Sequence, residues 1–317
     1  MDGAMRTAPR DIRVPVAGGD LRVAVWEPDP VAVRAEGETN AVRAEGETKR
    51  PDPPTALLVH GVTASHLAWS FVADELPGAR LIAPDLRGRG RSRDVGPSGM
   101  AAHAADLAAV LDSLGIERTL VVGHSMGAFV AVVFAYLYPE RVTRLILVDG
   151  GLPLDVPAGL DADELVSHIL GPTAARLSMR FSDLEEYLDF WRAHPAFQRD
   201  WSPQLEAYLA YDLVPDGTGA LRPATSYRAV AQDTVDMNTT AVIPDALAGL
   251  RHPAHFVSVP RGLRDEAPGL YAASRLPGLF AQHPSVTHER WDEFNHYTIV
   301  MTPAGAARVA GLVRAAM

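Results

Sequence analysis

The most constraining feature of the sequence is a short turn, Gly123-His124-Ser125-Met126-Gly127, between two apolar segments. Residues 119–122 are rich in β-branched side chains and predict a buried strand, while residues 128–138 are apolar over a length that predicts a buried helix. A strand, a Gly-x-Ser-x-Gly turn and a helix in this order bend the chain so tightly that the flanking residues must be small. Such a bend holds the serine hydroxyl clear of the backbone at the start of a helix, so Ser125 is a candidate nucleophile.

Composition narrows the class of protein. The chain has 317 residues, 47% of them hydrophobic, which suits one large domain or a core with an inserted subdomain. A formal net charge of −10 gives no basic field to attract a phosphate backbone, so we expect no nucleic-acid partner. The absence of cysteine excludes disulfides, thiolate catalysis and sulfur-bound zinc. Residues 1–13 contain no apolar run of signal-peptide length, and no later stretch reaches the length of a membrane span, so the simplest expectation is a soluble cytoplasmic protein without a membrane partner.

Strand-like and helix-like patterns alternate along most of the chain. Strands are expected at residues 12–16, 21–26, 56–60, 80–83, 119–122, 142–148, 255–259 and 286–291, and helices near 66–75, 101–114, 127–138, 270–282 and 303–316. This alternation predicts an α/β fold, a mostly parallel sheet with helices on both faces. The first two strands are separated by a short glycine-containing turn and read as a hairpin, which makes the leading edge of the sheet antiparallel.

The pattern changes between Gly150 and about Thr240, where amphipathic helical runs follow one another without a strand. We therefore expect a core of residues 1–150 and 241–317 and an all-helical insertion of residues 151–240. Placed between two core strands, this insertion should cover the carboxyl edge of the sheet as a cap, where open α/β sheets bind ligands.

A tandem duplication interrupts the first part of the core. Residues 32–40 are repeated almost unchanged as residues 41–49, and both copies are charged and poor in large apolar side chains. We interpret residues 29–54 as an exposed loop between strands.

A serine hydroxyl becomes a good nucleophile only beside a base, and that base needs a third group to orient it. His296 is the best candidate base, because it follows the last expected strand and precedes the final helix. Asp265 is the expected acid, since its place after the preceding strand gives the chain order Ser, Asp, His. Glu266 and Asp149 remain alternatives, and Asp149 could instead cap the turn that follows it.

The tetrahedral intermediate of acyl transfer carries negative charge on oxygen, which needs two aimed hydrogen-bond donors. One expected donor is the backbone N–H of Met126, and the other is the N–H of Val62, in the loop after the third expected strand. We expect His60 to shape this loop. His124 should also be structural, because so sharp a turn points its side chain away from the hydroxyl.

Five segments stand in the order and approximate spacing typical of one superfamily: His60-Gly61, Asp85-Leu86-Arg87-Gly88-Arg89-Gly90-Arg91-Ser92, Gly123-His124-Ser125-Met126-Gly127, Arg261-Gly262-Leu263-Arg264-Asp265 and Asn295-His296. On these motifs the chain resembles a capped, esterase-like member of the α/β-hydrolase superfamily from end to end, apart from the duplicated loop. The resemblance implies an eight-stranded core, a helical cap and a Ser-Asp-His triad. It also implies that Asp85 and Arg87 shape a loop, but it does not supply the substrate.

Single residues separate the reactions of this superfamily. Similar epoxide hydrolases and haloalkane dehalogenases carry aspartate where this chain has Ser125, and meta-cleavage carbon–carbon hydrolases usually carry Asn where it has His124. The leading hypothesis is a serine hydrolase that cleaves carboxylic esters of small hydrophobic substrates through an acyl-enzyme. Lactone hydrolysis and cofactor-free haloperoxidase-like activity are the alternatives, and a meta-cleavage hydrolase or a non-catalytic ligand receptor ranks below them.

Aromatic residues near the elbow and in the insertion predict an apolar pocket. Trp69, Phe129, Trp191 and Tyr208 are candidate lining residues, although packing between cap and core is an alternative role for each. No ligand spacing indicates a metal, no glycine pattern indicates a bound phosphate, and no cofactor is expected. The expected partner is a small-molecule ester, and the oligomeric state is left open.

Overall fold

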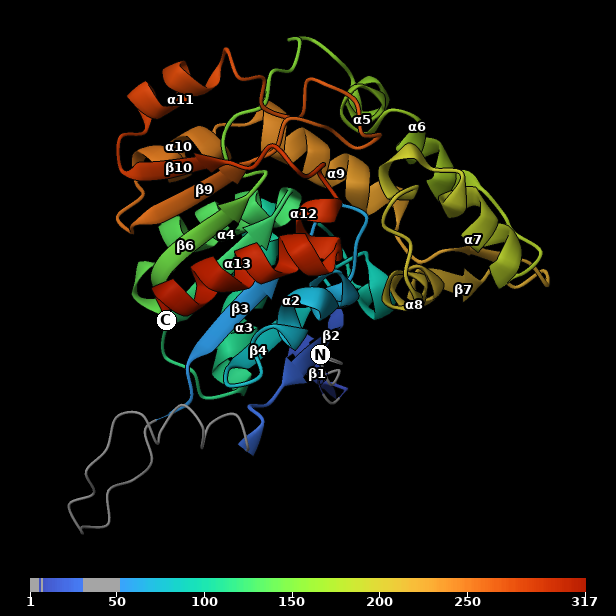
Figure 1. Cartoon of the computed structure of the whole chain (residues 1–317), viewed down its shortest axis with the longest axis horizontal. Coiled ribbons are helices and arrows are strands. Elements are labelled where there is room, and N and C mark those ends of the chain that lie inside the picture. The colour runs from blue at the N-terminus through green and yellow to red at the C-terminus, as the bar shows by residue number, and fades with distance from the viewer. Residues whose placement is uncertain (1–5, 7, 31–51) are drawn as a thin grey trace.

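The computed structural model describes residues 6, 8–30 and 52–317, so most of the expected loop at residues 29–54, including its duplication, lies outside the described residues. An eight-stranded sheet organises the rest (Figure 1). Its strands in chain order are β1 (Arg10–Val16), β2 (Gly19–Trp26), β3 (Thr55–Val59), β4 (Arg80–Pro84), β5 (Thr119–His124), β6 (Val142–Val148), β9 (Ala254–Ser258) and β10 (Val286–Arg290). Their order in space is β1-β2-β4-β3-β5-β6-β9-β10.

Strand direction confirms the expected fold class. β2 pairs antiparallel with β1 and with β4, and every other pair in this sheet is parallel. All eight expected strands are present close to their expected ends. The parallel strands therefore bring the loops after β3, β5, β6 and β9 to one edge of the sheet.

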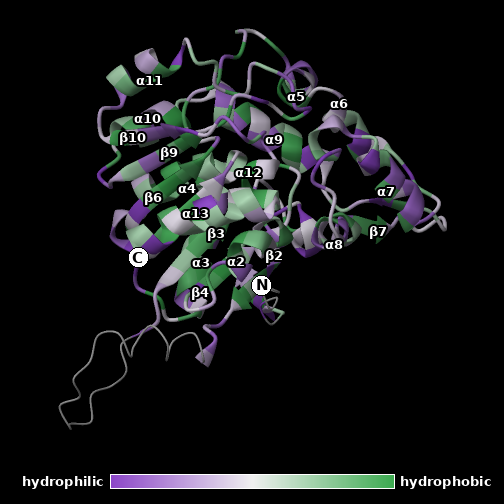
Figure 2. Ribbon diagram, viewed as in Figure 1, coloured by the Kyte–Doolittle hydropathy of each residue, from purple (hydrophilic) through white to green (hydrophobic). Residues whose placement is uncertain are grey.

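Helices cover both faces of the sheet because successive strand residues point to opposite faces. In β3, Leu57 and Val59 pack on the face of α3 (Met100–Ser113), α4 (Met126–Leu137), α10 (Val242–Ala248) and α11 (Leu276–Gln282). Ala56 and Leu58 pack on the face of α2 (Ser70–Asp74), α12 (Thr298–Met301) and α13 (Pro303–Ala316). Figure 2 shows apolar residues gathered on the strands of the sheet and on α4. Among the described helices, none combines the length and the apolar character needed to cross a membrane.

One expected helix is shorter than predicted. The pattern at residues 270–282 gives a helix only from Leu276 onward. Pro277 stands in the first turn of α11, where its missing N–H and fixed φ favour the start of a helix rather than its interior.

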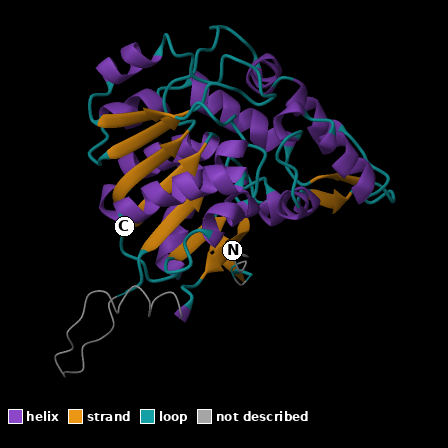
Figure 3. Ribbon diagram, in the orientation of Figure 1, coloured by secondary structure: helices purple, strands orange, loops and turns teal. Residues whose placement is uncertain are grey.

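The insertion between β6 and β9 is helical with one exception (Figure 3). It contains α5 (Ala162–Leu170), α6 (Pro172–Ala175), α7 (Leu184–Arg192), α8 (Pro203–Tyr211) and α9 (Tyr227–Thr239), together with two short 3₁₀ turns, η4 (Arg176–Ser178) and η5 (Pro195–Phe197). The prediction that it is all-helical was wrong, because β7 (Leu213–Pro215) and β8 (Leu221–Pro223) form an antiparallel pair. The turn between them is closed by Asp216, whose carboxylate accepts a hydrogen bond from the Thr218 N–H at 2.8 Å.

Candidate active site

Ser125 occupies the tight turn between β5 and α4. Its backbone has φ 55° and ψ −125°, a conformation that non-glycine residues rarely adopt. The turn closes only around glycine: a Cβ at Gly123 would lie 2.4 Å from the carbonyl oxygen of Gly127, and a Cβ at Gly127 would lie 2.1 Å from that of Val59. The Ser125 N–H donates to the Val148 carbonyl at 2.9 Å, which fixes the turn to β6. This is the strained geometry that the Gly-x-Ser-x-Gly sequence predicts.

The Ser125 side chain is half-buried and lines a pocket that also contains His296. Its hydroxyl makes no hydrogen bond to any other described residue, which leaves it available to a substrate or a base.

His296 is held rigidly just before α12. Its N–H donates to the Arg261 carbonyl at 3.0 Å, and the preceding Asn295 caps α12 by accepting hydrogen bonds from the N–H groups of Tyr297 and Thr298. Its Nδ1 lies 2.7 Å from Oδ2 of Asp149. A carboxylate can only accept, so Nδ1 carries the proton and Nε2 is left as an acceptor.

The prediction that Asp265 orients His296 was wrong, and the alternative, Asp149, occupies that position. Asp149 follows β6 directly and is fully buried, with φ 45° turning its carboxylate toward the imidazole. Asp265 is partly exposed; its Oδ1 forms an ion pair with Arg261, whose Nε lies 2.7 Å away, and accepts a hydrogen bond from Nδ2 of Asn295 at 3.1 Å. It therefore supports the segment that carries His296 without contacting the imidazole. The other alternative, Glu266, accepts from the Arg264 N–H.

The two expected oxyanion donors lie beside Ser125. Met126 is the first residue of α4, so its N–H has no partner one turn earlier in the helix. The loop that carries Val62 lies against the nucleophile, because a Cβ at Gly61 would be 3.2 Å from Cβ of Ser125. Neither N–H donates to another group in the described part of the chain. Both are thus free to face a ligand oxygen.

Two neighbouring histidines are neutral supports. His60 accepts from the Leu86 N–H at 2.9 Å and donates from Nδ1 to the Gly61 carbonyl, and burial lowers its pKa to about 4. Its expected loop-shaping role is thus borne out. Burial and the nearby His296 hold the pKa of His124 well below its ordinary value. His124 lies closer to the site than predicted, since it lines the pocket and its Nε2 is 2.8 Å from the His296 carbonyl oxygen.

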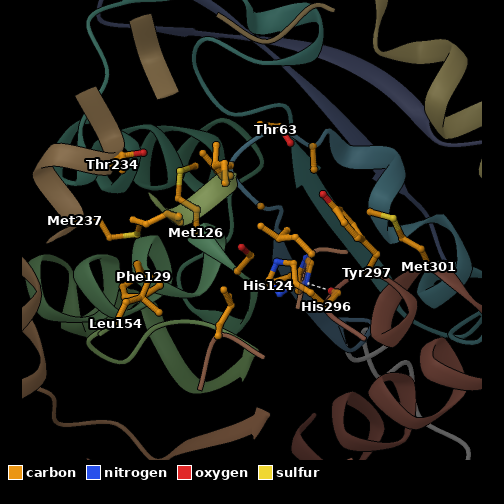
Figure 4. A pocket seen from close by; sticks show the side chains of 18 of the residues that line it. Thr63, His124, Met126, Phe129, Leu154, Thr234, Met237, His296, Tyr297 and Met301 are labelled. Atoms are coloured by element: carbon orange, nitrogen blue, oxygen red, sulfur yellow. Dashed lines mark hydrogen bonds between the residues drawn. The ribbon is translucent and has the colours of Figure 1, made fainter. Parts of the chain in front are cut away.

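The pocket is small and mostly apolar, with a volume of about 40 Å³. In Figure 4 His124 and His296 lie between two groups of lining side chains, Met126, Phe129, Leu154 and Met237 on one side and Tyr297 and Met301 on the other. Helices α5, α8 and α9 of the insertion close it with Ile169, Leu170, Tyr208, Thr234 and Met237.

Two of the four expected pocket residues line this pocket, and two do not. Phe129 and Tyr208 do. Trp69, in the 3₁₀ turn η1 (His66–Trp69), is fully buried in the core, and Trp191 packs inside the insertion with its ring centroid 5.6 Å from that of Phe197. The spacing of Thr234 and Met237 on one face of α9 was the sequence signal that could have identified two lining residues.

The sequence is similar to known hydrolases over part of its length. The family described as alpha/beta hydrolase fold matches residues 54–208. Lipase LipV of Mycobacterium tuberculosis is 39% identical over 127 residues, which are 39% of this chain and 49% of that protein. A 2-hydroxy-6-oxononadienedioate/2-hydroxy-6-oxononatrienedioate hydrolase of Burkholderia vietnamiensis is 47% identical over 102 residues, 30% of this chain and 35% of that protein. The chain thus spans about half the length of the first relative and about a third of the second.

The similarity of the fold extends over nearly the whole chain. The crystal structure of E-2-(acetamidomethylene)succinate hydrolase superposes with a TM-score of 0.73 at 19% identity, covering 96% of this chain and 100% of that one. At this identity the likeness concerns the fold alone. Residues 54–208 thus match the α/β-hydrolase family, and the described chain has the α/β-hydrolase fold.

Proposed function

We propose that the protein is a serine hydrolase that cleaves carboxylic esters of small hydrophobic substrates, with Ser125 as nucleophile, His296 as base and Asp149 as the acid that orients it. One observation carries the proposal: Ser125 stands at a strained elbow in the same pocket as His296, whose Nδ1 is hydrogen-bonded to a buried carboxylate. That is the arrangement that activates a hydroxyl for acyl transfer.

In this mechanism His296 Nε2 accepts the Ser125 proton while Oγ forms a bond to the ester carbonyl carbon. The carbonyl oxygen becomes an oxyanion that accepts hydrogen bonds from the N–H groups of Val62 and Met126. When the carbonyl re-forms, the bond to the alcohol oxygen breaks, and His296 returns its proton to the leaving alcohol. Water then repeats the sequence on the acyl-enzyme and releases the carboxylic acid, while Asp149 stabilises the imidazolium in both halves.

The lining of the pocket supports a neutral, apolar substrate. No arginine or lysine is among the described residues that line it. A dioate substrate, such as the Burkholderia relative's name indicates, carries two carboxylates, and burying these without a cation would be costly. Acetyl to butyryl esters fit a small apolar pocket better than charged or bulky ones.

We propose that the insertion, residues 151–240, is a cap over the pocket. Support comes from its lining residues on α5, α8 and α9, which lie opposite the loops that follow β3 and β5. A pocket of about 40 Å³ holds few waters, so a larger ligand requires the side chains of this cap to move.

A panel of p-nitrophenyl esters tests the proposal. Acetate and butyrate esters should be turned over, and the hemisuccinate ester, which matches butyrate in length but carries a carboxylate, should have a kcat/KM at least about tenfold lower. A phenyl-substituted meta-cleavage dienoate and a γ-lactone serve as probes of the competing reactions. Turnover of the dienoate with no turnover of any ester would overturn the proposal.

A further inference from the structure

Arg89 is a buried arginine that the proposed reaction does not use. It follows β4 in the Gly88-Arg89-Gly90 segment, and its side chain is 0% exposed. It forms an ion pair with Asp233, whose side chain is also 0% exposed. Burying both charges costs free energy unless the remaining N–H groups of the guanidinium also find acceptors. The groups that Arg89 contacts besides Asp233 therefore show which segments it holds in place.

Two of those contacts reach the segments that carry the proposed oxyanion donors. Arg89 Nε donates to the carbonyl oxygen of Val62 at 2.8 Å, and Nη2 lies 3.6 Å from Sδ of Met126. Within the described chain the Val62 carbonyl accepts no other hydrogen bond. The backbone of residues 61–64, which we call the oxyanion loop, has one internal hydrogen bond, from the Ala64 N–H to the Gly61 carbonyl at 3.2 Å. His60 Nδ1 contacts the Gly61 carbonyl at one end of the loop, and the guanidinium supplies the side-chain hydrogen bond at Val62 itself, so Arg89 is the polar anchor of the Val62 end.

The anion that neutralises Arg89 belongs to the insertion. Asp233 lies on α9 and also accepts from Oγ of Ser98 at 2.6 Å and contacts Nε2 of His103 at 3.1 Å. On the same helix, Thr234 and Met237 line the pocket. One helix thus shapes the substrate cavity and fixes the guanidinium that holds the oxyanion loop.

We propose that Arg89 is a positioning residue that sets the orientation of the Val62 N–H, and that through Asp233 it makes this orientation depend on the position of α9. The inference rests on the proposed esterase function. A donor moved by a fraction of an ångström loses much of its stabilisation of an oxyanion while substrate binding in the apolar pocket is unchanged. Arg89 should therefore affect kcat and leave KM nearly constant.

Arg89 Nη1 also donates to the carbonyl oxygen of Arg87 at 2.9 Å. Arg89→Lys tests the proposal, because lysine keeps a positive charge for Asp233 but has no planar fork to reach the Val62 carbonyl, the Arg87 carbonyl and the Met126 sulfur together. Arg87→Lys is the matched control. Arg87 is buried in the same segment and ion-paired to Asp106 at 2.5 Å, and its other acceptors are the carbonyls of Pro97 and Ala17, outside the oxyanion loop. Both substitutions change the same group at the same depth.

We expect Arg89→Lys to lower kcat for p-nitrophenyl butyrate by about tenfold to hundredfold, with KM changed by less than about threefold. A trifluoromethyl ketone, whose adduct with serine carries an oxyanion, should lose affinity by the same factor as kcat/KM. Arg87→Lys should keep both values near the parent's. Asp233→Asn preserves the shape of the side chain but removes its negative charge, and it should lower kcat by a smaller factor than Arg89→Lys. If Arg89→Lys does not fold, Asp233→Asn takes its place in the comparison.

Amide hydrogen exchange provides a readout that does not depend on ester turnover. A peptide that spans the oxyanion loop should exchange its amide hydrogens faster in Arg89→Lys than in Arg87→Lys. The same comparison applies to Asp233→Asn if Arg89→Lys does not fold. Equal exchange in the folded variants, or equal kcat losses for Arg89→Lys and Arg87→Lys, would overturn the inference. Faster exchange in Arg89→Lys, together with a parent protein that cleaves no ester, would keep the anchoring role and reject the proposed function.

Discussion

At the scale of single residues, the carboxylate that contacts His296 makes the sharpest prediction. Asp149→Asn should lower kcat/KM for p-nitrophenyl butyrate by roughly 10³-fold or more, because an amide neither stabilises the imidazolium nor fixes its tautomer. Asp265→Asn should cost less than about tenfold, because Asp265 acts only through Asn295 and Arg261.

The two substitutions control for each other, since both replace a carboxylate by an amide of the same shape. Steady-state kinetics on both purified variants, with circular dichroism to confirm folding, decides between them. A larger loss for Asp265→Asn would return the acid to the position predicted from the motif order.

His60 predicts how stability changes with pH. Its pKa is lowered from 6.5 to about 4, mainly by burial, so between these values the unfolded chain binds a proton that the folded protein does not. The free energy of unfolding therefore falls as pH falls from about 6.5 toward 4, and this one group accounts for about 3 kcal/mol of that fall.

Urea unfolding of His60→Gln at several pH values checks this. The variant should lose less stability than the parent between pH 6.5 and 4, whatever its stability at pH 7. His168→Gln, at an exposed position of α5, is the control and should follow the parent. An identical decline in His60→Gln and the parent would contradict the neutral, buried state of His60.

At the scale of elements, α9 predicts substrate size. Met237 is buried and lines the pocket from this helix, so Met237→Ala should enlarge the space beside Phe129 and Leu154. The ratio of kcat/KM for the octanoate ester to that for the butyrate ester should rise about tenfold. Val235→Ala removes apolar volume from a residue of α9 that does not line the pocket, and it should leave the ratio unchanged. If Met237→Ala and Val235→Ala had the same octanoate-to-butyrate ratio of kcat/KM, the acyl chain would not lie against Met237.

The elements of the core were predictable from sequence because periodicity reports which side of a strand or helix is buried. The elbow followed from local sequence alone, since only glycine fits around Ser125. The carboxylate that contacts His296 could not be predicted from local sequence. Asp149 and Asp265 both follow parallel strands and both have positive φ, and only the tertiary arrangement decides which of them lies beside the imidazole. The Asp149-Gly150-Gly151 sequence at the end of an apolar strand was the available signal. Trp69 and Trp191 were misplaced because aromatic composition does not distinguish a pocket wall from a packed core.

At the scale of the whole molecule, a few buried polar contacts join the insertion to the core. Tyr211 on α8 donates to the Asp85 carboxylate at 2.6 Å, and the Asn295 amide donates to the Ala196 carbonyl at 3.0 Å. Asp85 also accepts from the backbone N–H groups of His66 and Arg91, which is the loop-shaping role implied by the motif. The contact with Tyr211 extends that role to the insertion.

Tyr211→Phe should lower the free energy of unfolding by about 2 kcal/mol, because it removes a hydrogen bond to a buried carboxylate. Tyr227→Phe is the control: its hydroxyl also donates to a carboxylate, Asp163, at 2.6 Å, but on the surface, where the loss should be under about 0.5 kcal/mol. Urea denaturation of both variants gives the comparison. Similar losses for the two would show that the contact with Asp85 does not fasten the insertion.

The most direct test of the whole account is the covalent labelling of Ser125. An alkyl p-nitrophenyl phosphonate should add one phosphonyl group per chain, on the peptide that contains Ser125, in proportion to the loss of ester turnover. Ser125→Ala should take up no label, keep the parent's fold and lose roughly 10⁴-fold or more in kcat. A label on another residue, or a Ser125→Ala variant that keeps more than a few per cent of the parent's turnover, would contradict the assignment of Ser125 as nucleophile.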